Sequence, residues 1–357
     1  MLRKLCVLAI TLAGIQYSFA QETAPVEEKK STTTISGFAD TYFRYDFDKN
    51  TSNNRTSFTN SHNSFELGMA SLKVEHSFGK VSMVADLGFG KRAQEFSYNE
   101  SGVVAAIKQL YVSYAPTDYL KFTAGSWATH VGYELVDAPA NRNYSMSYMF
   151  SWGPFSHTGI KADLTFGKSG IMIGVANPTD YKSAPLDSKK FILAQYSYAM
   201  NDNWKLYLNY VGGKRPSDSA KTNQYDLVVT GKLSDKFSIG ANGTLQTQKY
   251  QVANKYESDA KSWSGAALYL NYDPTALFGL TLRSELFSDK DQLVAMSLAP
   301  AGANIFANTL SANFRIGGLT LIPELRLESG TKDVFYNEEG ALKASNFSAL
   351  FAAVYKF

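Results

Sequence analysis

The sequence predicts an all-β fold, namely a single transmembrane antiparallel β-barrel of about sixteen strands. Three observations lead to this prediction. The closing segment, Asn346 to Phe357, alternates its apolar residues with the period of two that a strand requires. Short and long connections alternate along the whole chain. After the first twenty residues there is no run of eighteen apolar residues, which excludes helical membrane spans.

The N-terminal segment has the pattern of an export signal. Arg3 and Lys4 precede an apolar run, and Ser18-Phe19-Ala20 provides a small-x-small cleavage site. The following residues are polar and too few for a separate domain. The predicted organisation is a signal peptide at 1–20, a flexible periplasmic leader at 21–33 and a transmembrane β-barrel at 34–357.

The composition of the exported chain narrows its class further. Cys6, the only cysteine, lies inside the export signal, so the mature chain has no disulfide and no thiolate chemistry. The signal holds two of the 35 basic residues and none of the 32 acidic ones, which leaves the mature chain near neutral. Bulk charge therefore gives no indication of nucleic-acid binding.

Sixteen segments have strand character. In the fifteenth, Leu325 and Leu327 alternate with charged neighbours, as expected when one face meets lipid and the other meets water. Merging or splitting one hairpin would change the number to fourteen or eighteen. Pro323 lacks a backbone N–H, so we expect a local bulge there. The expected segments are 34–47, 64–78, 81–90, 103–115, 119–127, 158–167, 170–177, 190–200, 204–213, 223–233, 236–247, 263–273, 279–288, 305–316, 319–330 and 346–357.

The connections between these segments predict the orientation of the barrel. Seven are short and rich in turn residues, such as Gly79-Lys80 and Gly317-Gly318, while eight are long. Outer-membrane barrels place short turns in the periplasm and long loops outside. We therefore expect both termini in the periplasm of a Gram-negative bacterium.

The closing segment carries a more specific resemblance. Phe351, Tyr355 and Phe357 share its apolar face, and the chain ends on an aromatic residue. This resembles the last strand of bacterial outer-membrane barrels, in which such residues form the assembly signal. The resemblance implies recognition by the barrel-assembly machinery and contact with outer-membrane lipid and lipopolysaccharide.

The longest connection, with its flanks at 125–159, resembles a known family. The matching residues are Gly132-Tyr133-Glu134, Asp137-Ala138-Pro139, Asn141, Asn143-Tyr144-Ser145, Ser147-Tyr148, Phe150-Ser151, Gly153-Pro154-Phe155 and His157-Thr158-Gly159. The stretch is similar to the OmpL-like β-barrel porins of Bacteroidota and related Gram-negative bacteria. The resemblance implies a membrane channel for small solutes. Resemblance to general porins also suggests a homotrimer.

The same connection is the third long loop and carries charges of both signs. In general porins the third external loop folds into the lumen. One interpretation is therefore a pore constriction with a transverse field, formed by Glu134 and Asp137 against Arg142. The alternative is a lid that only stiffens the rim, packed by the loop's own aromatic residues: Tyr133, Tyr144, Tyr148, Phe150, Trp152 and Phe155.

Several strand charges should line the lumen, because Lys or Arg facing lipid costs about 2–4 kcal/mol at the bilayer midplane. They could select solutes, or they could form a self-neutralised wall that keeps the interior wet. We favour the second interpretation, because no long row of one sign is present. These residues are Asp40, Arg44, Arg283, Glu285, Arg315, Glu324, Arg326 and Glu328.

Indications of an enzyme are weak. Phe166-Gly167-Lys168-Ser169 ends like a phosphate-binding loop but lacks its first glycine and precedes a strand. His130 and His157 flank one loop and could approach each other, yet the four histidines lack metal-ligand spacing. We expect no catalytic residues, no metal and no cofactor.

The sequence thus favours an outer-membrane porin that lets small hydrophilic solutes and ions diffuse passively through a water-filled channel. Three alternatives stay open: a channel selective for phosphate, other anions or sugars; an outer-membrane hydrolase; and a structural barrel with a plugged lumen. The expected partners are the membrane lipids, the assembly machinery, small solutes and further copies of the chain, with no nucleic acid.

Overall fold

The computed structural model describes residues 31–252, 255–256, 259–296 and 302–357. The predicted signal peptide and most of the predicted leader lie outside the described residues. In that part of the chain, no helix has the length and apolar character needed to cross a membrane.

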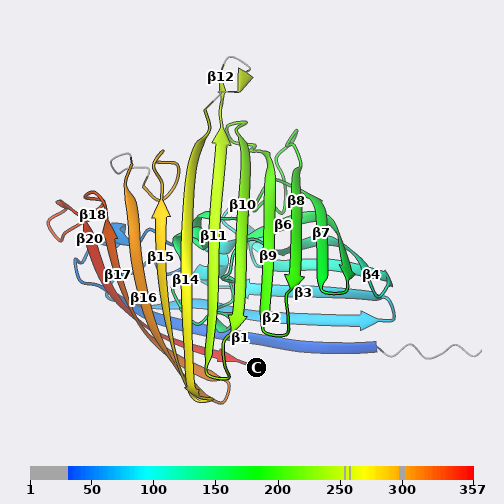
Figure 1. Ribbon diagram of the computed structural model, residues 1–357, viewed down its shortest axis with the longest axis horizontal. Helices are drawn as coiled ribbons and strands as arrows, with labels where there is room; N and C mark the ends of the chain where they lie inside the picture. The colour runs from blue at the N-terminus through cyan, green and yellow to red at the C-terminus, as the bar shows by residue number, and fades with distance from the viewer. Residues whose placement is uncertain (1–30, 253–254, 257–258, 297–301) are drawn as a thin grey trace, which may run out of the picture. The chain divides into compact units, whose positions relative to one another are not determined.

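Sixteen long strands form one closed antiparallel barrel, as predicted. Each pairs with its neighbours in the sequence, and Figure 1 shows β9, β10, β11 and β14 running side by side. The sixteen are β1 (Ser31–Asp46), β2 (Ser64–Phe78), β3 (Val81–Phe89), β4 (Ile107–Thr117), β5 (Leu120–Ala128), β6 (Ser156–Phe166), β7 (Ser169–Ala176), β8 (Phe191–Ala199), β9 (Trp204–Lys214), β10 (Lys221–Lys232), β11 (Phe237–Lys249), β14 (Lys261–Thr275), β15 (Phe278–Ser288), β16 (Asn304–Ile316), β17 (Leu319–Gly330) and β20 (Ser345–Lys356).

The remaining elements lie in the long connections. Two small hairpins lie in the loops, and the first extends beyond the end of β11 in Figure 1. They consist of β12 (Gln251–Val252) with β13 (Lys255–Tyr256), and β18 (Phe335–Tyr336) with β19 (Leu342–Lys343). The short helices are η1 (Thr51–Asn53), α1 (Lys91–Phe96), α2 (Gly102–Ala105), η2 (Ala138–Ala140) and α3 (Tyr148–Trp152).

Three local predictions need correction. β1 begins at Ser31, so residues 31–33 belong to the barrel and not to the leader. Residues 103–105 form part of α2, and the fourth strand begins only at Ile107. Pro323 produces no bulge, because β17 keeps one register with β20 across it, with Pro323 opposite Phe351.

Alternation along each strand separates the two faces of the wall. On β17, Leu325 and Leu327 are exposed on the outside, whereas Glu324, Arg326 and Glu328 are buried on the inside. Charged side chains are thereby kept away from the hydrocarbon of the bilayer, where they are costly.

β20 closes the barrel by pairing with both β17 and β1. Phe351, Tyr355 and Phe357 are exposed on the outer face, and the N–H of Gly37 donates to the carbonyl of Phe357 at 3.1 Å. The closing segment is thus a seam strand with aromatic residues on the outer face. The lumen-facing Ala352, on the opposite face, is fully buried.

Candidate functional site

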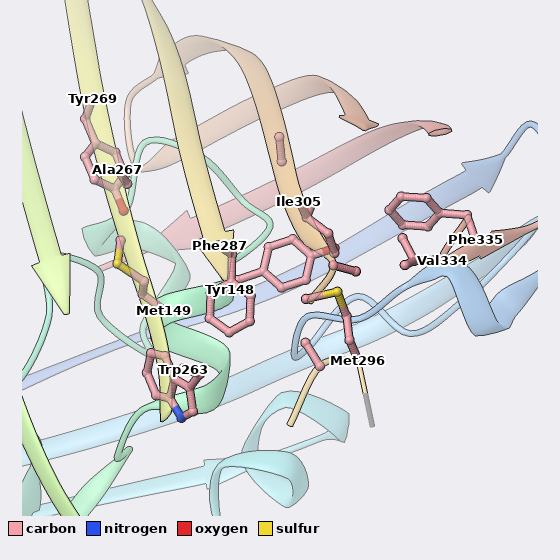
Figure 2. Packing of buried hydrophobic residues seen from close by; sticks show 13 residues of the cluster. Tyr148, Met149, Trp263, Ala267, Tyr269, Phe287, Met296, Ile305, Val334 and Phe335 are labelled. Atoms are coloured by element: carbon pink, nitrogen blue, oxygen red, sulfur yellow. The ribbon is translucent and has the colours of Figure 1, made fainter. Parts of the chain in front are cut away.

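The third long loop, residues 129–155 between β5 and β6, lies against the inner wall of the barrel and is called loop 3. Tyr144 and Tyr148 are fully buried. Figure 2 shows Tyr148 and Met149 of α3 facing Trp263 and Phe287 of the wall, and the rings of Tyr148 and Phe287 stack with centroids 5.1 Å apart. The loop's aromatic residues therefore pack against the strands and not only against each other.

Glu134 attaches the first half of loop 3 to the wall. Its carboxylate oxygen lies 2.6 Å from Nη1 of Arg283 on β15, and both side chains are buried. The same guanidinium donates to the carbonyls of Ser145 at 2.7 Å and Met146 at 3.2 Å. Arg283 thus joins both halves of the loop, and a buried ion pair of this kind is costly to break from one side.

Arg142 makes a more solvent-exposed attachment, close to the short turn that joins β14 and β15. Its guanidinium donates to both carboxylate oxygens of Asp273 on β14 at 2.8 Å, in the two-point geometry that favours Arg–carboxylate pairs. Arg315 on β16 donates to the same carboxylate at 2.9 Å. These three side chains keep about three tenths of their surface exposed. Of the loop 3 ion pairs, this one keeps both of its side chains in partial contact with solvent.

Asp137 pairs with a residue that the sequence analysis did not single out. Its carboxylate lies 2.6 Å from Nζ of Lys108 on β4, and that ammonium also lies 3.1 Å from Asp86 on β3. Burial raises the pKa of Asp137, and the charge of Lys108 opposes this. Lys108 sits where the β3–β4 register shifts. Such an irregularity turns a side chain to a face that strict alternation does not predict.

The predicted arrangement of the three loop charges therefore needs correction. Glu134 and Asp137 do not oppose Arg142 across an open passage, because the structure pairs each of the three with a different strand of the wall. Each loop charge has an opposite charge beside it, so the transverse field expected from the sequence is weakened within each pair.

The acidic residues of the inner wall bind the backbone of loop 3. Glu324 accepts from the N–H groups of Tyr144 at 2.8 Å and Ser145 at 3.2 Å. Glu285 accepts from the N–H of Tyr148 at 2.8 Å, and the Tyr148 hydroxyl donates to Glu328 at 2.7 Å. The predicted lumen-wall carboxylates thus satisfy loop N–H groups that would otherwise be buried without partners.

Basic wall residues complete this network. Arg326 lies 3.2 Å from Glu285 and 3.0 Å from Glu328, so one arginine offsets part of the charge of two carboxylates. On β1, Arg44 pairs with Asp46 at 3.0 Å and donates to the carbonyl of Ser61 at 2.8 Å. The self-neutralised wall stays a prediction, because Glu324 has no ion-pair partner among the described residues and accepts from backbone N–H groups instead.

Asp40 and a residue missed by the sequence analysis hold the middle of loop 3. The Tyr144 hydroxyl donates to the Asp40 carboxylate. Arg92 of α1, fully buried, lies 3.8 Å from Asp40 and donates to the carbonyls of Val136 and Tyr144. Arg92 lies in the second long loop, and its sequence context carries no periodicity that would place it inside the barrel.

Further contacts attach the two ends of loop 3. The N–H of Gly132 donates to Asp226 on β10 at 3.0 Å. The rings of His130 and His157 approach to 5.2 Å, and burial lowers the pKa of His130 to about 4. Among the described residues, no group of three or more His, Cys, Asp or Glu side chains is arranged to hold a metal ion.

Asp180, in the loop between β7 and β8, secures the end of loop 3. One carboxylate oxygen accepts from the N–H groups of Phe155 at 2.7 Å and Ser156 at 2.8 Å, and the other accepts from the Tyr98 hydroxyl at 2.9 Å. The side chain is buried, and this burial raises the pKa of Asp180 to about 6. Three long loops therefore meet at one carboxyl group.

A cavity of about 490 Å³ lies on the side of loop 3 that faces the long loops, and we call it the loop-end cavity. Its volume is within the range of small-molecule sites. The wall beside it comes from β8 to β11, opposite Trp152 and Pro154 of loop 3. Its polar lining includes Thr222, Gln224, Gln246 and Gln248.

Comparison with known proteins supports a channel fold. Residues 32–357 match the family described as "Putative beta-barrel porin-2, OmpL-like". No curated protein matches the chain.

Several solved porin structures share the fold at low identity. The chain is similar to outer-membrane expressed OmpT of Vibrio cholerae, with 10% identity, a TM-score of 0.57, and 92% of this chain and 98% of that chain covered. It is also similar to in-vitro folded OmpT of Vibrio cholerae, described as a trimer form. This match has 12% identity and a TM-score of 0.57, and it covers 92% of this chain and 99% of that chain. A mutant of Rh. blastica porin matches with 12% identity and a TM-score of 0.52, and the match covers 91% of this chain and 100% of that chain.

Proposed function

Because the chain belongs to the putative beta-barrel porin-2, OmpL-like family, we propose a specific route for solutes through this outer-membrane porin. The protein forms a water-filled channel, and loop 3 is the part that narrows it. Small hydrophilic solutes and ions pass between loop 3 and the wall formed by β8 to β11. The loop-end cavity, bounded by these strands and loop 3, is the observation that carries this proposal.

The distribution of contacts supports this route. Buried charged contacts attach loop 3 densely to β15 and β17, through Arg283, Glu285, Glu324, Arg326 and Glu328. Asp226 makes an attachment to the opposite wall, and the cavity lies on that side. A passage beside the more lightly attached edge needs the least rearrangement of buried ion pairs.

The three loop charges act in the constriction through their wall partners. Glu134 and Asp137 hold the loop in position, while the partly exposed Arg142–Asp273–Arg315 group is placed to act on passing ions. The wall charges that bind loop 3 serve the same positioning role. Single-channel conductance in planar bilayers, with the reversal potential under a salt gradient, tests the proposal. Discrete ohmic steps support it, and a bilayer that stays silent contradicts it.

A plugged structural barrel is the second candidate, and one observation favours it. Loop 3 has partners on many sides of the wall, including Lys108 on β4, Asp226 on β10 and Asp273 on β14. Deleting 138–147 separates the two functions. A plugged barrel gains conductance only after the deletion, whereas a channel conducts before it and conducts more afterwards.

The short turns, Ser31 and Phe357 lie at one end of the strands, and we place that end in the periplasm. The channel works without catalysis. His76 on β2 forms a hydrogen bond with Thr33 at 2.8 Å near a short turn. Phe351, Tyr355 and Phe357 serve as the assembly signal for the barrel-assembly machinery, and the outer aromatic face contacts lipid and lipopolysaccharide.

We also propose a homotrimer that uses the outer face of β10 to β16. A depression of about 470 Å³ there has small residues in its lining, such as Ala241, Gly243 and Ala266. Beside it Ser284 donates to Asn308 at 2.7 Å on the outer face, a polar pair that a protein neighbour would shield from lipid. Chemical cross-linking of the wild type and of Ala266→Trp tests this, with loss of the trimer expected in the variant.

A further inference from the structure

The loop-end cavity is polar but electrically balanced. Among its described lining residues only Asp180 and Arg215 carry a charge. Asp180 is occupied by two N–H groups and one hydroxyl. Arg215 lies 3.2 Å from Asp218 and donates to Gln248 at 2.9 Å. An anion would need an uncompensated cation or several free N–H groups to replace its hydration, and the cavity offers neither from these two residues.

Three glutamines form a chain of amides along one side of this cavity. Gln224 on β10 stands directly opposite Gln246 on β11, and Gln248 follows two positions later on the same face. Gln248 Nε2 donates to Gln246 Oε1 at 2.9 Å, and Gln246 Nε2 donates to Gln224 Oε1 at 3.2 Å. The inner face of two adjacent strands thus presents a continuous row of amides.

Two fixed donors set the direction of this row. The Trp263 indole N–H, which can only donate, bonds to Gln246 Oε1 at 2.9 Å. The Arg215 guanidinium, also only a donor, bonds to Gln248 Oε1. The oxygens of Gln246 and Gln248 are therefore occupied, and the nitrogen of each points toward the next residue of the row.

The row ends in an amide nitrogen without a partner. Gln224 is only 3% exposed, and its Nε2 makes no hydrogen bond within the described structure. It lies beside Gly153 of loop 3, 3.3 Å from the position that a Cβ at this glycine would occupy. A buried donor left unsatisfied costs about 1–3 kcal/mol, so a solute that accepts its hydrogen bond gains that energy.

Aromatic side chains from three loops also line the cavity. They are Tyr98, Trp152 and Tyr181. Trp152 keeps about a third of its surface exposed, while its indole N–H is held by the carbonyl of Arg55 at 3.0 Å. Fixed rings of this kind provide flat apolar surfaces next to the amide donors.

We propose that the loop-end cavity binds neutral polyhydroxylated solutes, of the size of a mono- to trisaccharide, as they enter the channel. Hydroxyl and ring oxygens accept from Gln224 and its neighbours, and the apolar faces of sugar rings stack on the aromatic side chains. This inference rests on the proposed function, because it assigns a substrate class to the same passage. It selects sugars over phosphate or other anions among the alternatives raised by the sequence.

Maltose serves as the probe, with inorganic phosphate as its charged counterpart. Binding to the detergent-solubilised protein is measured by calorimetry, and block of the ion current is measured in planar bilayers. The variants are Gln224→Leu, which keeps the size and removes the amide, and Trp152→Leu. Gln251→Leu makes the same change in the β12 strand, outside the cavity lining, and is the matched control.

The expected result is saturable maltose binding and a saturable current block in the wild type and in Gln251→Leu. Gln224→Leu weakens both about tenfold, which corresponds to about 1.4 kcal/mol. Trp152→Leu also weakens both the maltose binding and the current block. A maltose effect that never saturates, equal effects in all variants, or tighter binding of phosphate overturns the inference. Failure of the channel itself is distinguishable, because it abolishes the ion current and leaves the calorimetric binding in place.

Discussion

The carboxylate of Glu134 and the guanidinium of Arg283 meet at 2.6 Å, although 149 positions separate them in the sequence. Both side chains are buried, and Arg283 also holds two carbonyls from the second half of loop 3. This ion pair is therefore a central attachment of the loop to the barrel wall.

Arg283→Met should release loop 3 without unfolding the barrel. The substitution leaves Glu134 buried without its cation, and breaking a buried pair from one side costs about 3–5 kcal/mol. We expect faster proteolysis within residues 129–155 and a larger, noisier conductance. The double variant Glu134→Gln with Arg283→Met should be less impaired than the sum of the single variants. Additive effects would show that the two side chains are not coupled.

Arg142→Ala should change ion selectivity more than Glu134→Gln does. Removing Arg142 uncovers part of the Asp273 charge at a partly exposed position, whereas Glu134 is buried. We expect the reversal potential to move toward cations in Arg142→Ala and to stay near the wild-type value in Glu134→Gln, which instead loosens the loop. Lys49→Ala, at an exposed loop pair with Glu338, is the control. A larger shift in the control than in Arg142→Ala would contradict the assignment.

Phe351→Arg and Ala352→Arg should both impair assembly, for different reasons. Phe351 faces lipid, where Arg costs about 2–4 kcal/mol. Ala352 faces the lumen but is fully buried against Tyr144 and Ile322, so a large side chain does not fit. Phe351→Leu and Ala352→Ser should assemble normally. The yield of heat-modifiable protein in the outer membrane measures this, and normal yield of Phe351→Arg would refute the register.

Asp180 should make the attachment of loop 3 sensitive to pH. Its folded-state pKa, about 6, is above the ordinary value of 3.8, so the folded form holds the proton more tightly. Its contribution to the stability of this attachment is therefore complete below about pH 4. It decreases by roughly 3 kcal/mol as the pH rises to about 6. Hydrogen exchange at the Phe155 and Ser156 amides, corrected for intrinsic rates, should show more opening at pH 7 than at pH 4.5.

Asp180→Asn provides the control for this pH dependence. The amide oxygen can still accept from both N–H groups, but it does not titrate. The difference in local opening between the two pH values should therefore disappear in the variant. If it persists unchanged, another group is responsible.

The sequence by itself determined the barrel, its sixteen strands and the outward face of the last strand. Strand alternation is a local property, because the pleat puts successive side chains on opposite faces wherever one face meets lipid. Leu325 beside Arg326 therefore already indicates which side faces the membrane. The inward orientation of the eight predicted wall charges follows from the same rule.

Only the tertiary structure decided the partners of these charges. Asp137 meets Lys108 because β4 departs from regular pairing, and Arg142 meets Asp273 because loop 3 crosses the barrel. Arg92 comes from α1 in the second long loop, and Gln224 comes from β10, far away in the sequence. Long-range contacts depend on how an irregular loop folds against a closed wall, and no local periodicity encodes that path. Closure of the barrel brings β1 to β20, and it thereby creates the interior in which all of these pairs form.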